Sequence, residues 1–494
     1  MLKVLNKMLP YYRYSDPFAC DRAPAEIIRK RRLGREGLRR DAIQPAGQPA
    51  IPDIEFGDMH RVPFQFREAV QDLPGMDPYL RVSDQQKGEE IFSSYGVDVF
   101  GGDFYKSCLE DALAGMDGYD FKLGKYHPVI DEVIRQLKEV SGQEAFTFHM
   151  SGTEAVLSAC RMARLSTGRD HIVKFRGAYH GWTETAGLKT INSLFRLRRM
   201  NNAAGVLINP LTHLYKRGVS KTDALLYGRA TGDTFDKEAA IRFIREVKDI
   251  CTEKQIPLIF DEVFLGFRLA HGGCQEFFRT AADMVIYGKT LGGGMPVGVV
   301  CGRRRFMKKF DPDYPLNMLT GKGTFSAHPL VLLAMHQFLR RVGPQDYAGM
   351  EELWNKRVQQ LNRRVSRFPI KFDNLQSVMT THHLVPSRYN WMFQFYLARE
   401  GMEPGPYGSG RFIFCINLAG EEWDRIVDKF VRAAESMEQD GWWWHRDSAP
   451  WRVPLSLAGE VFRANMSRLT NREGLRRGQS IEGNRSRAHS SLNL

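Results

Sequence analysis

An acidic and a basic side chain each end a short apolar run in the middle of the sequence. Residues 258–260 lead into Asp261, and residues 284–288 lead into Lys289. Runs this short are typical of buried parallel strands rather than helices. Because ligands bind beyond the carboxyl ends of the strands in an open α/β sheet, Asp261 and Lys289 are predicted to face one crevice from neighbouring strands. A salt bridge at the sheet edge is the alternative interpretation of this pair.

A cofactor that needs an amine and a carboxylate together is pyridoxal phosphate. Its aldehyde forms a Schiff base with a lysine, and its ring nitrogen needs a carboxylate to stay protonated. Its phosphate is bound by backbone N–H groups at a helix start. The Gly-Lys-Thr at 288–290 also suggests a P-loop, but Asp283 stands where that motif requires its first glycine, so the P-loop is rejected.

The sequence Ser151-Gly152-Thr153 stands between a strand-like segment and a predicted helix. Helix starts carry free N–H groups and a partial positive charge, which bind phosphate. Gly152 would let the backbone approach the anion closely, and the two hydroxyls would add donors. Taken alone, the same residues are better explained by ordinary capping of the helix by Ser151 or Thr153, with Glu154 nearby.

Two further positions are placed to cover the faces of a flat ring. Tyr179 and His180 follow the next predicted strand, again at its carboxyl end. An aromatic side chain there stacks on a ring or merely covers the sheet edge. Val263 lies two residues beyond Asp261 and is therefore predicted to share its face and to press on the opposite side of the ring.

The length of 494 residues predicts two packed domains. Alternating strand and helix patterns predict an α/β large domain over 126–342, with a mostly parallel sheet covered by helices, and a smaller α+β domain over 343–445. Residues 61–125 are predicted to pack on both domains. Residues 1–60 are interpreted as a basic extension, and residues 446–494 as a basic, mostly disordered tail. The clearest helical patterns cover 128–142, 154–168, 236–254 and 328–342, and the clearest strands cover 145–150, 171–175 and 203–210.

The net charge of +13 belongs to the two ends of the chain. Residues 1–40 contain 11 Lys/Arg and 4 Asp/Glu, and residues 445–494 contain 9 and 4, which leaves +1 for the remainder. A nucleic-acid-binding body is therefore not expected. The basic run 29–32 is interpreted as a solvated arm, with contact to RNA or to an acidic partner as the alternative.

The cysteines and the hydropathy pattern predict the compartment. Seven cysteines are scattered without a CxxC pair, which indicates reduced thiols in a cytoplasm and no metal site. No apolar run approaches the roughly 18–20 residues of a membrane span. The amino-terminal residues lack the apolar core of a signal peptide and contain too many acidic residues for a transit peptide.

Five motifs occur in a fixed order: SGTEA, GAYHG, DEVxxGFR, the lysine of YGKTLGGGMPVG, and GTFSAHP. Together they resemble the class-III, fold type I, pyridoxal-phosphate aminotransferases. The strongest likeness is to glutamate-1-semialdehyde 2,1-aminomutase and to related aminotransferases of polyketide and nonribosomal-peptide assembly lines. The spacing of 28 residues from Asp261 to Lys289 also looks like that family. The likeness is strongest from about 125 to 335 and absent at both ends.

The resemblance implies a role for each matching residue. Lys289 resembles the Schiff-base lysine and proton shuttle, and Asp261 looks like the partner of the pyridine nitrogen. Tyr179 and Val263 look like the two faces of the ring sandwich, and residues 151–153 resemble the phosphate cup.

The resemblance also implies a homodimer with shared active sites. Thr324, in the GTFSAHP segment, resembles the residue that reaches the phosphate bound by the partner subunit. The alternative is a threonine that caps the following helix of its own chain.

The implied function is amino-group transfer from a small amino acid donor to a carbonyl acceptor, of the aminotransferase or 2,1-aminomutase type. The acceptor is either free or tethered to an acyl carrier. A racemase or decarboxylase on the same scaffold, or a cofactor-binding protein without turnover, are the alternatives. Three departures from the family bear on the substrate: Asn209-Pro210 replaces Glu-Pro, the segment 401–412 lacks a clear counterpart of the family's glycine loop and glutamate, and the amino-terminal half-motif is not recognisable.

Overall fold

The computed structural model describes twelve parts of the chain. They are residues 89–90, 93–117, 123, 126–175, 178–182, 188–191, 193–210, 237–308, 323–384, 393–403, 411–439 and 443. The predicted amino-terminal extension, its basic run at 29–32 and the predicted tail at 446–494 lie outside these residues.

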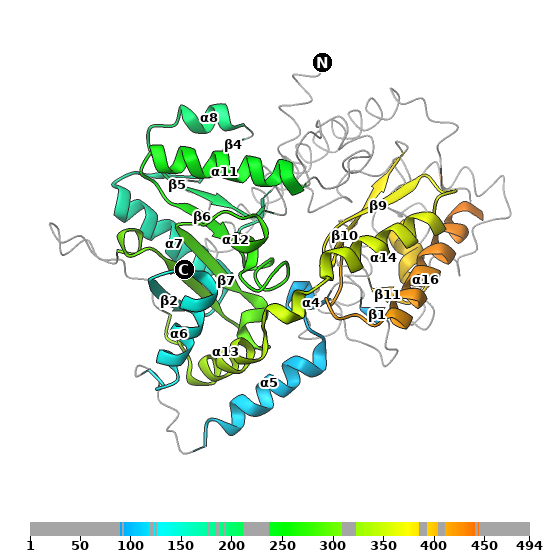
Figure 1. Cartoon of the computed structure of the whole chain (residues 1–494), viewed down its shortest axis with the longest axis horizontal. Coiled ribbons are helices and arrows are strands. Elements are labelled where there is room, and N and C mark those ends of the chain that lie inside the picture. The colour runs from blue at the N-terminus through cyan, green and yellow to red at the C-terminus, as the bar shows by residue number, and fades with distance from the viewer. Residues whose placement is uncertain are drawn as a thin grey trace, which may run out of the picture.

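A seven-stranded sheet forms the centre of the larger part of the molecule (Figure 1), and its strand order is β2-β8-β7-β6-β5-β3-β4. The strands β4, β3, β5, β6 and β7 run parallel, whereas β8 is antiparallel to both of its neighbours, β7 and β2. The predicted mostly parallel α/β sheet is therefore confirmed. The strands are β2 (Ala145–His149), β3 (His171–Phe175), β4 (Leu188–Ile191), β5 (Ala203–Ile208), β6 (Leu258–Asp261), β7 (Met284–Gly288) and β8 (Gly298–Gly302).

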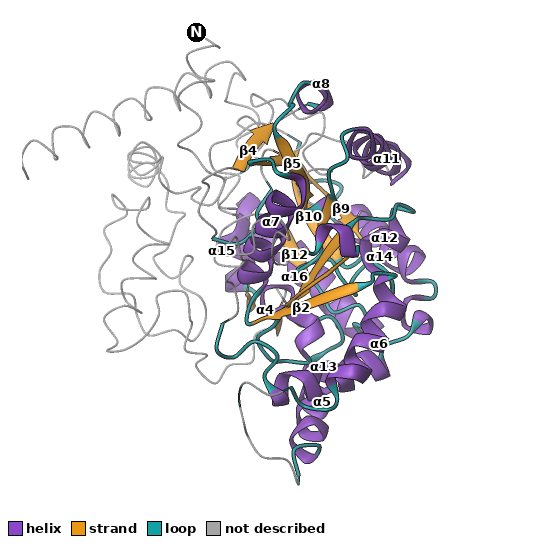
Figure 2. Cartoon of the chain, turned by 90° about the vertical axis from the view of Figure 1, so that its left-hand side faces the viewer, coloured by secondary structure: helices purple, strands orange, loops and turns teal. Residues whose placement is uncertain are grey.

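Helices cover both faces of this sheet. The helix α7 (Gly152–Thr167) packs on one face, against a cluster that includes Leu207, Ile259 and Ile286. The other face belongs to a larger core and is covered by α6 (Ile130–Ser141), α11 (Lys237–Glu253) and α13 (Pro329–Arg341). Figure 2 shows α7 and α11 on opposite sides of the strands. These four helices and the strands β2, β3 and β5 occur where their apolar periodicity predicts them.

A second, antiparallel sheet lies beside the first, at the right of Figure 1. Its order is β12-β10-β9, and α14 (Met350–Arg364) and α16 (Gly420–Gln439) pack with it. All of its strands follow residue 342, where the sequence predicts the start of a smaller domain, and the boundary itself remains a prediction. The strands are β9 (Ile370–Leu375), β10 (Val378–His383) and β12 (Arg411–Ile413).

The remaining elements are short, apart from α5. A two-stranded parallel pair, β1 with β11, joins the amino-terminal segment to the smaller part of the molecule. None of the described helices is long and apolar enough to cross a bilayer. These elements are β1 (Glu89–Glu90), α4 (Ser93–Gly96), α5 (Gly102–Ala114), α8 (Leu194–Arg198), α12 (Gly273–Phe277), η4 (Lys289–Gly292), η5 (Arg304–Phe306), η6 (Pro344–Tyr347), α15 (Phe393–Arg399) and β11 (Met402–Glu403).

Candidate active site

Asp261 and Lys289 lie at the carboxyl ends of adjacent parallel strands. Asp261 is the last residue of β6 and pairs with Ile286 of β7, and Lys289 follows β7 directly. The φ angle of Lys289 is 46°, in the left-handed region that residues other than glycine rarely adopt. Such backbone strain is concentrated at functional sites. The prediction that the two side chains meet at one sheet edge is consistent with this placement.

The Asp261 carboxylate is buried and held by two hydrogen bonds. Its Oδ2 accepts a hydrogen bond from Nδ1 of His180 at 2.7 Å, and its Oδ1 accepts one from the Val263 backbone N–H at 3.2 Å. His180 is itself buried, so this contact is shielded from water. His180, predicted as a cofactor contact, is thus placed to act through Asp261.

The Lys289 amine is half-buried and makes no hydrogen bond or ion pair within the described residues. The structure therefore contains no salt bridge between Lys289 and Asp261. Its Nζ lies 5.9 Å from the centroid of the Phe264 ring. Burial lowers the pKa of Lys289; the Asp261 carboxylate opposes this shift, and Arg268 adds to it. A lysine that is more easily neutral is a better nucleophile and base.

The start of α7 combines capping with free donors. Ser151 is the N-cap residue, its Oγ accepts a hydrogen bond from the Glu154 N–H at 3.2 Å, and Glu154 Oε2 accepts one from the Met150 N–H at 3.0 Å. The capping interpretation therefore holds for Ser151. The N–H groups of Gly152 and Thr153 donate to no described residue, so they remain available to an anion.

Val263 joins the two halves of the site. A Cβ added at Gly152 would lie 2.6 Å from Cγ1 of Val263, and one added at Gly288, just before Lys289, would lie 3.2 Å from the same atom. Only glycine at position 152 lets the start of α7 approach the turn after Asp261 so closely. Val263 therefore lies close both to the start of α7 and to Gly288, the residue before Lys289, and it follows Asp261 by two positions.

The loop that carries Tyr179 packs against the same helix start. A Cβ added at Gly181 would lie 2.4 Å from Oγ1 of Thr153. Tyr179 precedes Gly181 by two residues and is 67% exposed. Stacking of Tyr179 on a cofactor ring remains a prediction, as does the role of Val263 on the opposite face.

These residues fit pyridoxal phosphate chemically. The site offers an amine without a recorded hydrogen-bond partner, a carboxylate that accepts two hydrogen bonds, and free N–H groups at the start of a helix of 16 residues. It also contains buried polar atoms that no described protein group satisfies, Nε2 of His180 and Oδ1 of Asn209. An orphaned buried polar atom requires an explanation, and a bound ligand supplies one.

Comparison with known proteins identifies the family. A sequence profile of the family described as aminotransferase class-III matches residues 113–368, more than half of the chain. This chain belongs to the class-III aminotransferases. The family membership agrees with the motifs SGTEA, GAYHG and DEVxxGFR and with the placement of the residues that they carry.

Similar proteins of this family include two curated relatives named glutamate-1-semialdehyde 2,1-aminomutase. The protein of Methanocaldococcus jannaschii is 30% identical over 404 residues, which covers 71% of this chain and 90% of that protein. The protein of Alkaliphilus oremlandii is 33% identical over 251 residues, and the match spans 48% of this chain and only 58% of that protein. Among solved structures, a glutamate-1-semialdehyde aminomutase from Pseudomonas aeruginosa PAO1, in complex with PMP, matches with a TM-score of 0.56 and 17% identity, over 71% of this chain and 84% of that one.

Thr324 lies on the surface of this class-III chain and does not cap α13. The N-cap residue of α13 is His328, whose Nδ1 accepts a hydrogen bond from the Leu330 N–H at 3.2 Å. The helix-capping alternative for Thr324 is therefore wrong. A Cβ added at the preceding Gly323 would lie 3.7 Å from Sδ of Met150 and 3.8 Å from Oε2 of Glu154, which places the segment beside the start of α7.

Arg268 is a buried residue of the DEVxxGFR motif to which the sequence assigned no role. Its guanidinium donates to Oγ of Ser377 at 2.8 Å and to the Phe414 carbonyl at 2.7 Å, both beside the smaller sheet. Weaker bonds reach the carbonyls of Gly96 and Asp98 at 3.4 and 3.3 Å. Within the described residues it pairs with no carboxylate. Arg268 thus fastens the turn after β6 to the amino-terminal segment and to the smaller sheet.

Glu262, next to Asp261, is a buried carboxyl group that contacts α12 instead of the site. Its Oε2 accepts a hydrogen bond from the Cys274 N–H at 2.7 Å, and its Oε1 has no hydrogen-bond partner among the described residues. Burial raises the pKa of Glu262 to about 8 from its usual value of 4.5. The folded protein therefore keeps a proton that the unfolded chain loses, and the stability from this group is full below pH 4.5 and is lost as the pH rises towards 8.

Glu262→Gln is expected to remove this pH dependence. Relative to wild type, the free energy of unfolding of the variant should rise with pH by about 1.4 kcal/mol per unit between roughly pH 5 and 8. Urea unfolding at about pH 5.5 and 7.5 measures the difference. The exposed Glu276 of α12 is the matched control, and Glu276→Gln should leave the pH dependence as in wild type. A constant difference between Glu262→Gln and wild type would show that the buried carboxyl is ionised throughout.

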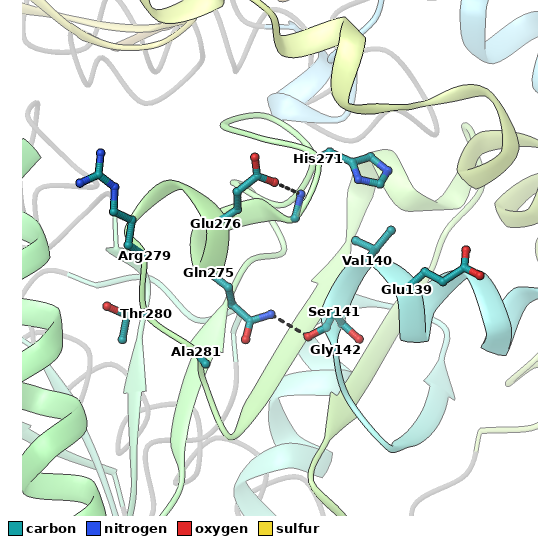
Figure 3. Close-up of a pocket in the computed structure, with 11 residues that line it drawn as sticks. Glu139, Val140, Ser141, Gly142, His271, Gln275, Glu276, Arg279, Thr280 and Ala281 are labelled. Atoms are coloured by element: carbon teal, nitrogen blue, oxygen red, sulfur yellow. Dashed lines mark hydrogen bonds between the residues drawn. The ribbon is translucent and has the colours of Figure 1, made fainter.

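A cavity beside the sheet is separate from this site. It has a volume of about 500 Å³ and lies between the end of α6 and the region of α12 (Figure 3). Within it, Gln275 donates to the Ser141 carbonyl at 3.0 Å, and Glu276 accepts from the Gly272 N–H at 2.7 Å. It is lined by Ala281, which precedes β7, whereas Lys289 follows that strand, so the cavity is at the opposite end of the strand.

Among the residues that the structure describes, no group of three or more His, Cys, Asp or Glu side chains is arranged to hold a metal ion.

Proposed function

We propose that this chain catalyses pyridoxal-phosphate-dependent amino-group transfer from an amino acid donor to a carbonyl acceptor. One observation carries the proposal: Lys289, whose amine has no hydrogen-bond partner among the described residues, directly follows the strand adjacent to the one that ends in the His180-bound Asp261. The aminotransferase class-III family match supports the same reaction class.

Class-III aminotransferases use pyridoxal phosphate, which when bound supplies an electrophilic carbon and an electron-accepting ring. Lys289 would hold it covalently and Asp261 would bind its ring nitrogen. The N–H groups of Gly152 and Thr153 would bind its phosphate, and Tyr179 and Val263 would cover the two faces of its ring. These residues follow the carboxyl ends of strands of the seven-stranded sheet, which is where ligands bind in α/β folds.

The chain's own residues account for the proton transfers. Burial lowers the pKa of Lys289 and so favours its neutral form, and the neutral amine would take the α-proton of the donor and return it to another carbon. His180 and the Val263 N–H both donate to the Asp261 carboxylate and fix its position. His180 therefore orients the carboxylate that holds the ring.

An amino-donor experiment tests the reaction class. The cofactor-loaded protein is mixed with single amino acids in a stopped-flow instrument, and conversion of the cofactor from its aldehyde to its amine form is followed by absorbance. Transfer predicts this conversion and its reversal by a carbonyl acceptor. Racemisation or decarboxylation without conversion, or no spectral change with any donor, would contradict amino-group transfer.

The names of the curated relatives favour a 2,1-aminomutase as the specific form of this activity. Glutamate 1-semialdehyde is therefore the first substrate to test, with mass spectrometry and NMR reading whether the amino group moves between the two neighbouring carbons. Free oxo acids and aldehydes, and carbonyl groups tethered to an acyl carrier, form the other arms of the screen. A product whose amino group stays on its original carbon excludes the aminomutase form.

A homodimer with shared sites is part of the proposal. Three segments that meet at the start of α7 expose large apolar side chains, and Trp182 is 85% exposed. Exposed apolar surface around a site is typical of a protein interface. The other three side chains of this surface are those of Met150, Tyr179 and Phe325. We infer that a second copy covers this surface and that its Thr324 reaches the phosphate.

Mixing two inactive variants tests the shared site. Thr324→Glu places a negative charge where the phosphate would be, and Lys289→Ala removes the amine. If each site takes Lys289 from one subunit and Thr324 from the other, the heterodimer has one intact site and one with both lesions. Random exchange should then restore roughly a quarter of wild-type turnover. Proven subunit exchange without any recovery would assign Thr324 to its own subunit's site or to none.

The described cysteines support a reducing compartment. Within the described residues no disulfide forms, and the cysteines there are Cys108, Cys160, Cys251, Cys274, Cys301 and Cys415. We propose a cytoplasmic enzyme whose ligands are small molecules.

A further inference from the structure

The backbone of Lys289 needs support from its neighbours. Its φ angle of 46° is in the left-handed region, and a residue other than glycine keeps such a conformation only where the surrounding structure holds it. The amine makes no hydrogen bond or ion pair within the described residues, so the side chain is not anchored by polar contacts of its own. The direction of the side chain therefore depends on what holds η4, the turn that begins at Lys289.

Thr290, the residue after Lys289, is held by Tyr105 of α5. The Tyr105 hydroxyl lies 2.5 Å from Oγ1 of Thr290, which is a hydrogen-bond distance, and both residues are buried. Within the described part of the chain, this is the only side-chain hydrogen bond of residues 289–292. The two residues are 185 positions apart in the sequence, so only the fold brings them together.

The same hydroxyl is joined to the smaller part of the molecule. It accepts a hydrogen bond from the Val99 N–H at 2.9 Å, and the Val99 carbonyl accepts one from the Ile416 N–H at 2.8 Å. Ile416 follows β12, a strand of the smaller sheet. A hydrogen-bonded path therefore runs from η4 through Tyr105 and the amino-terminal segment to the chain that leaves the smaller sheet.

Packing alone does not account for a tyrosine at position 105. Its ring packs edge-on against Phe104, with 5.3 Å between the ring centroids, and a phenylalanine would fill the same space. The hydroxyl is what tyrosine adds, and a buried hydroxyl costs free energy unless it is hydrogen-bonded. Burial raises the pKa of Tyr105, so the hydroxyl stays protonated and serves as a hydrogen-bonding group rather than as a base.

We propose that Tyr105 is a positioning residue that holds Lys289 in its reactive orientation through Thr290. This role rests on the proposed function, in which Lys289 carries the cofactor. Attack on an aldehyde carbon requires the amine nitrogen to approach in a defined direction, and a small misplacement slows such a step strongly. By fixing Oγ1 of Thr290, the Tyr105 hydroxyl fixes the turn from which the amine projects.

Formation of the link between cofactor and lysine tests this role apart from turnover. The full-length protein, freed of cofactor, is mixed with pyridoxal phosphate in a stopped-flow instrument. The absorbance reports the step in which the amine adds to the aldehyde carbon and water leaves. The dependence of the rate on cofactor concentration separates the affinity for the cofactor from the limiting rate of this step. Tyr105→Phe and Thr290→Val should each lower the limiting rate roughly tenfold and change the half-saturating concentration by less than about twofold.

The double variant shows whether the two hydroxyls act as one unit. Because each substitution removes the same hydrogen bond, Tyr105→Phe combined with Thr290→Val should be no slower than either single variant. Slowing that multiplies to roughly a hundredfold in the double variant would overturn the proposal, since the hydroxyls would then act independently. An unchanged limiting rate in either single variant would also overturn it.

The matched control is Tyr347, whose hydroxyl donates to the Phe267 carbonyl at 2.7 Å, outside η4. Tyr347→Phe also removes one hydrogen bond of a tyrosine hydroxyl, and it should keep the wild-type limiting rate. An equal slowing in Tyr347→Phe would show that any loosening of the core has this effect, and it would overturn the proposal. A wild-type protein in which no lysine-linked cofactor forms would instead overturn the proposed function.

Discussion

Lys289→Ala is expected to lower turnover by roughly 10³-fold or more, since the residue supplies both the covalent link to the cofactor and the mobile proton. The fold should be unaffected, because the half-buried amine makes no hydrogen bond or ion pair within the described residues. Amino-transfer rates and circular dichroism measure the two effects. Lys356→Ala is the matched control, because Lys356 is an exposed lysine of α14 whose recorded ion pair is with Glu352.

Retention of turnover in Lys289→Ala within about tenfold of wild type, or 1.4 kcal/mol of barrier, would contradict the assignment. Lys289→Arg sharpens the test. It keeps a positive charge at the carboxyl end of β7, but a guanidinium is neither a nucleophile nor a base at neutral pH. Turnover should therefore be lost in this variant too.

Asp261→Asn is expected to keep the cofactor and to lower turnover by about a hundredfold, or 2.7 kcal/mol of barrier. The single amide oxygen can still accept the hydrogen bond from His180, whereas the Val263 N–H loses its acceptor. The negative charge opposite the ring nitrogen is also lost. Steady-state rates and cofactor absorbance are the measurements, and Glu262→Gln, which changes the adjacent buried carboxyl, should retain turnover. Activity of Asp261→Asn within about tenfold of wild type would give the carboxylate another role.

The large sheet could be predicted because its signals are local. The helix α11 repeats buried apolar residues such as Ala240, Ile244, Val247 and Cys251 at helical spacing, and β6 and β7 are short, fully buried runs. The same pattern put Asp261 and Lys289 at strand ends.

The smaller sheet and α5 could not be predicted in detail, because their sequences carry weak local signals. The strands β9 and β10 bury Asp373, Thr380 and His382 among their apolar residues, which hides the alternation expected of a strand. The helix α5 follows Gly101, which offers no capping side chain. Tertiary packing decides the structure of such segments.

Some features of the site could likewise be predicted from the local sequence, and others could not. The capping and phosphate-binding interpretations of residues 151–153 are compatible, because Ser151 caps while the next two N–H groups donate to no described residue. The contact of His180 with Asp261, the span of Arg268 between two sheets and the orphaned amide of Asn209 all depend on residues far apart in the sequence. No local pattern could reveal them.

Borohydride reduction of the cofactor-loaded protein shows directly whether Lys289 carries the cofactor. Reduction makes the link between cofactor and lysine permanent, so digestion and mass spectrometry can locate it. We expect the added mass of the reduced cofactor on the peptide that contains Lys289, and no labelled peptide in Lys289→Ala. Label on a different lysine of the wild-type protein, or cofactor bound without any labelled peptide, would contradict this expectation.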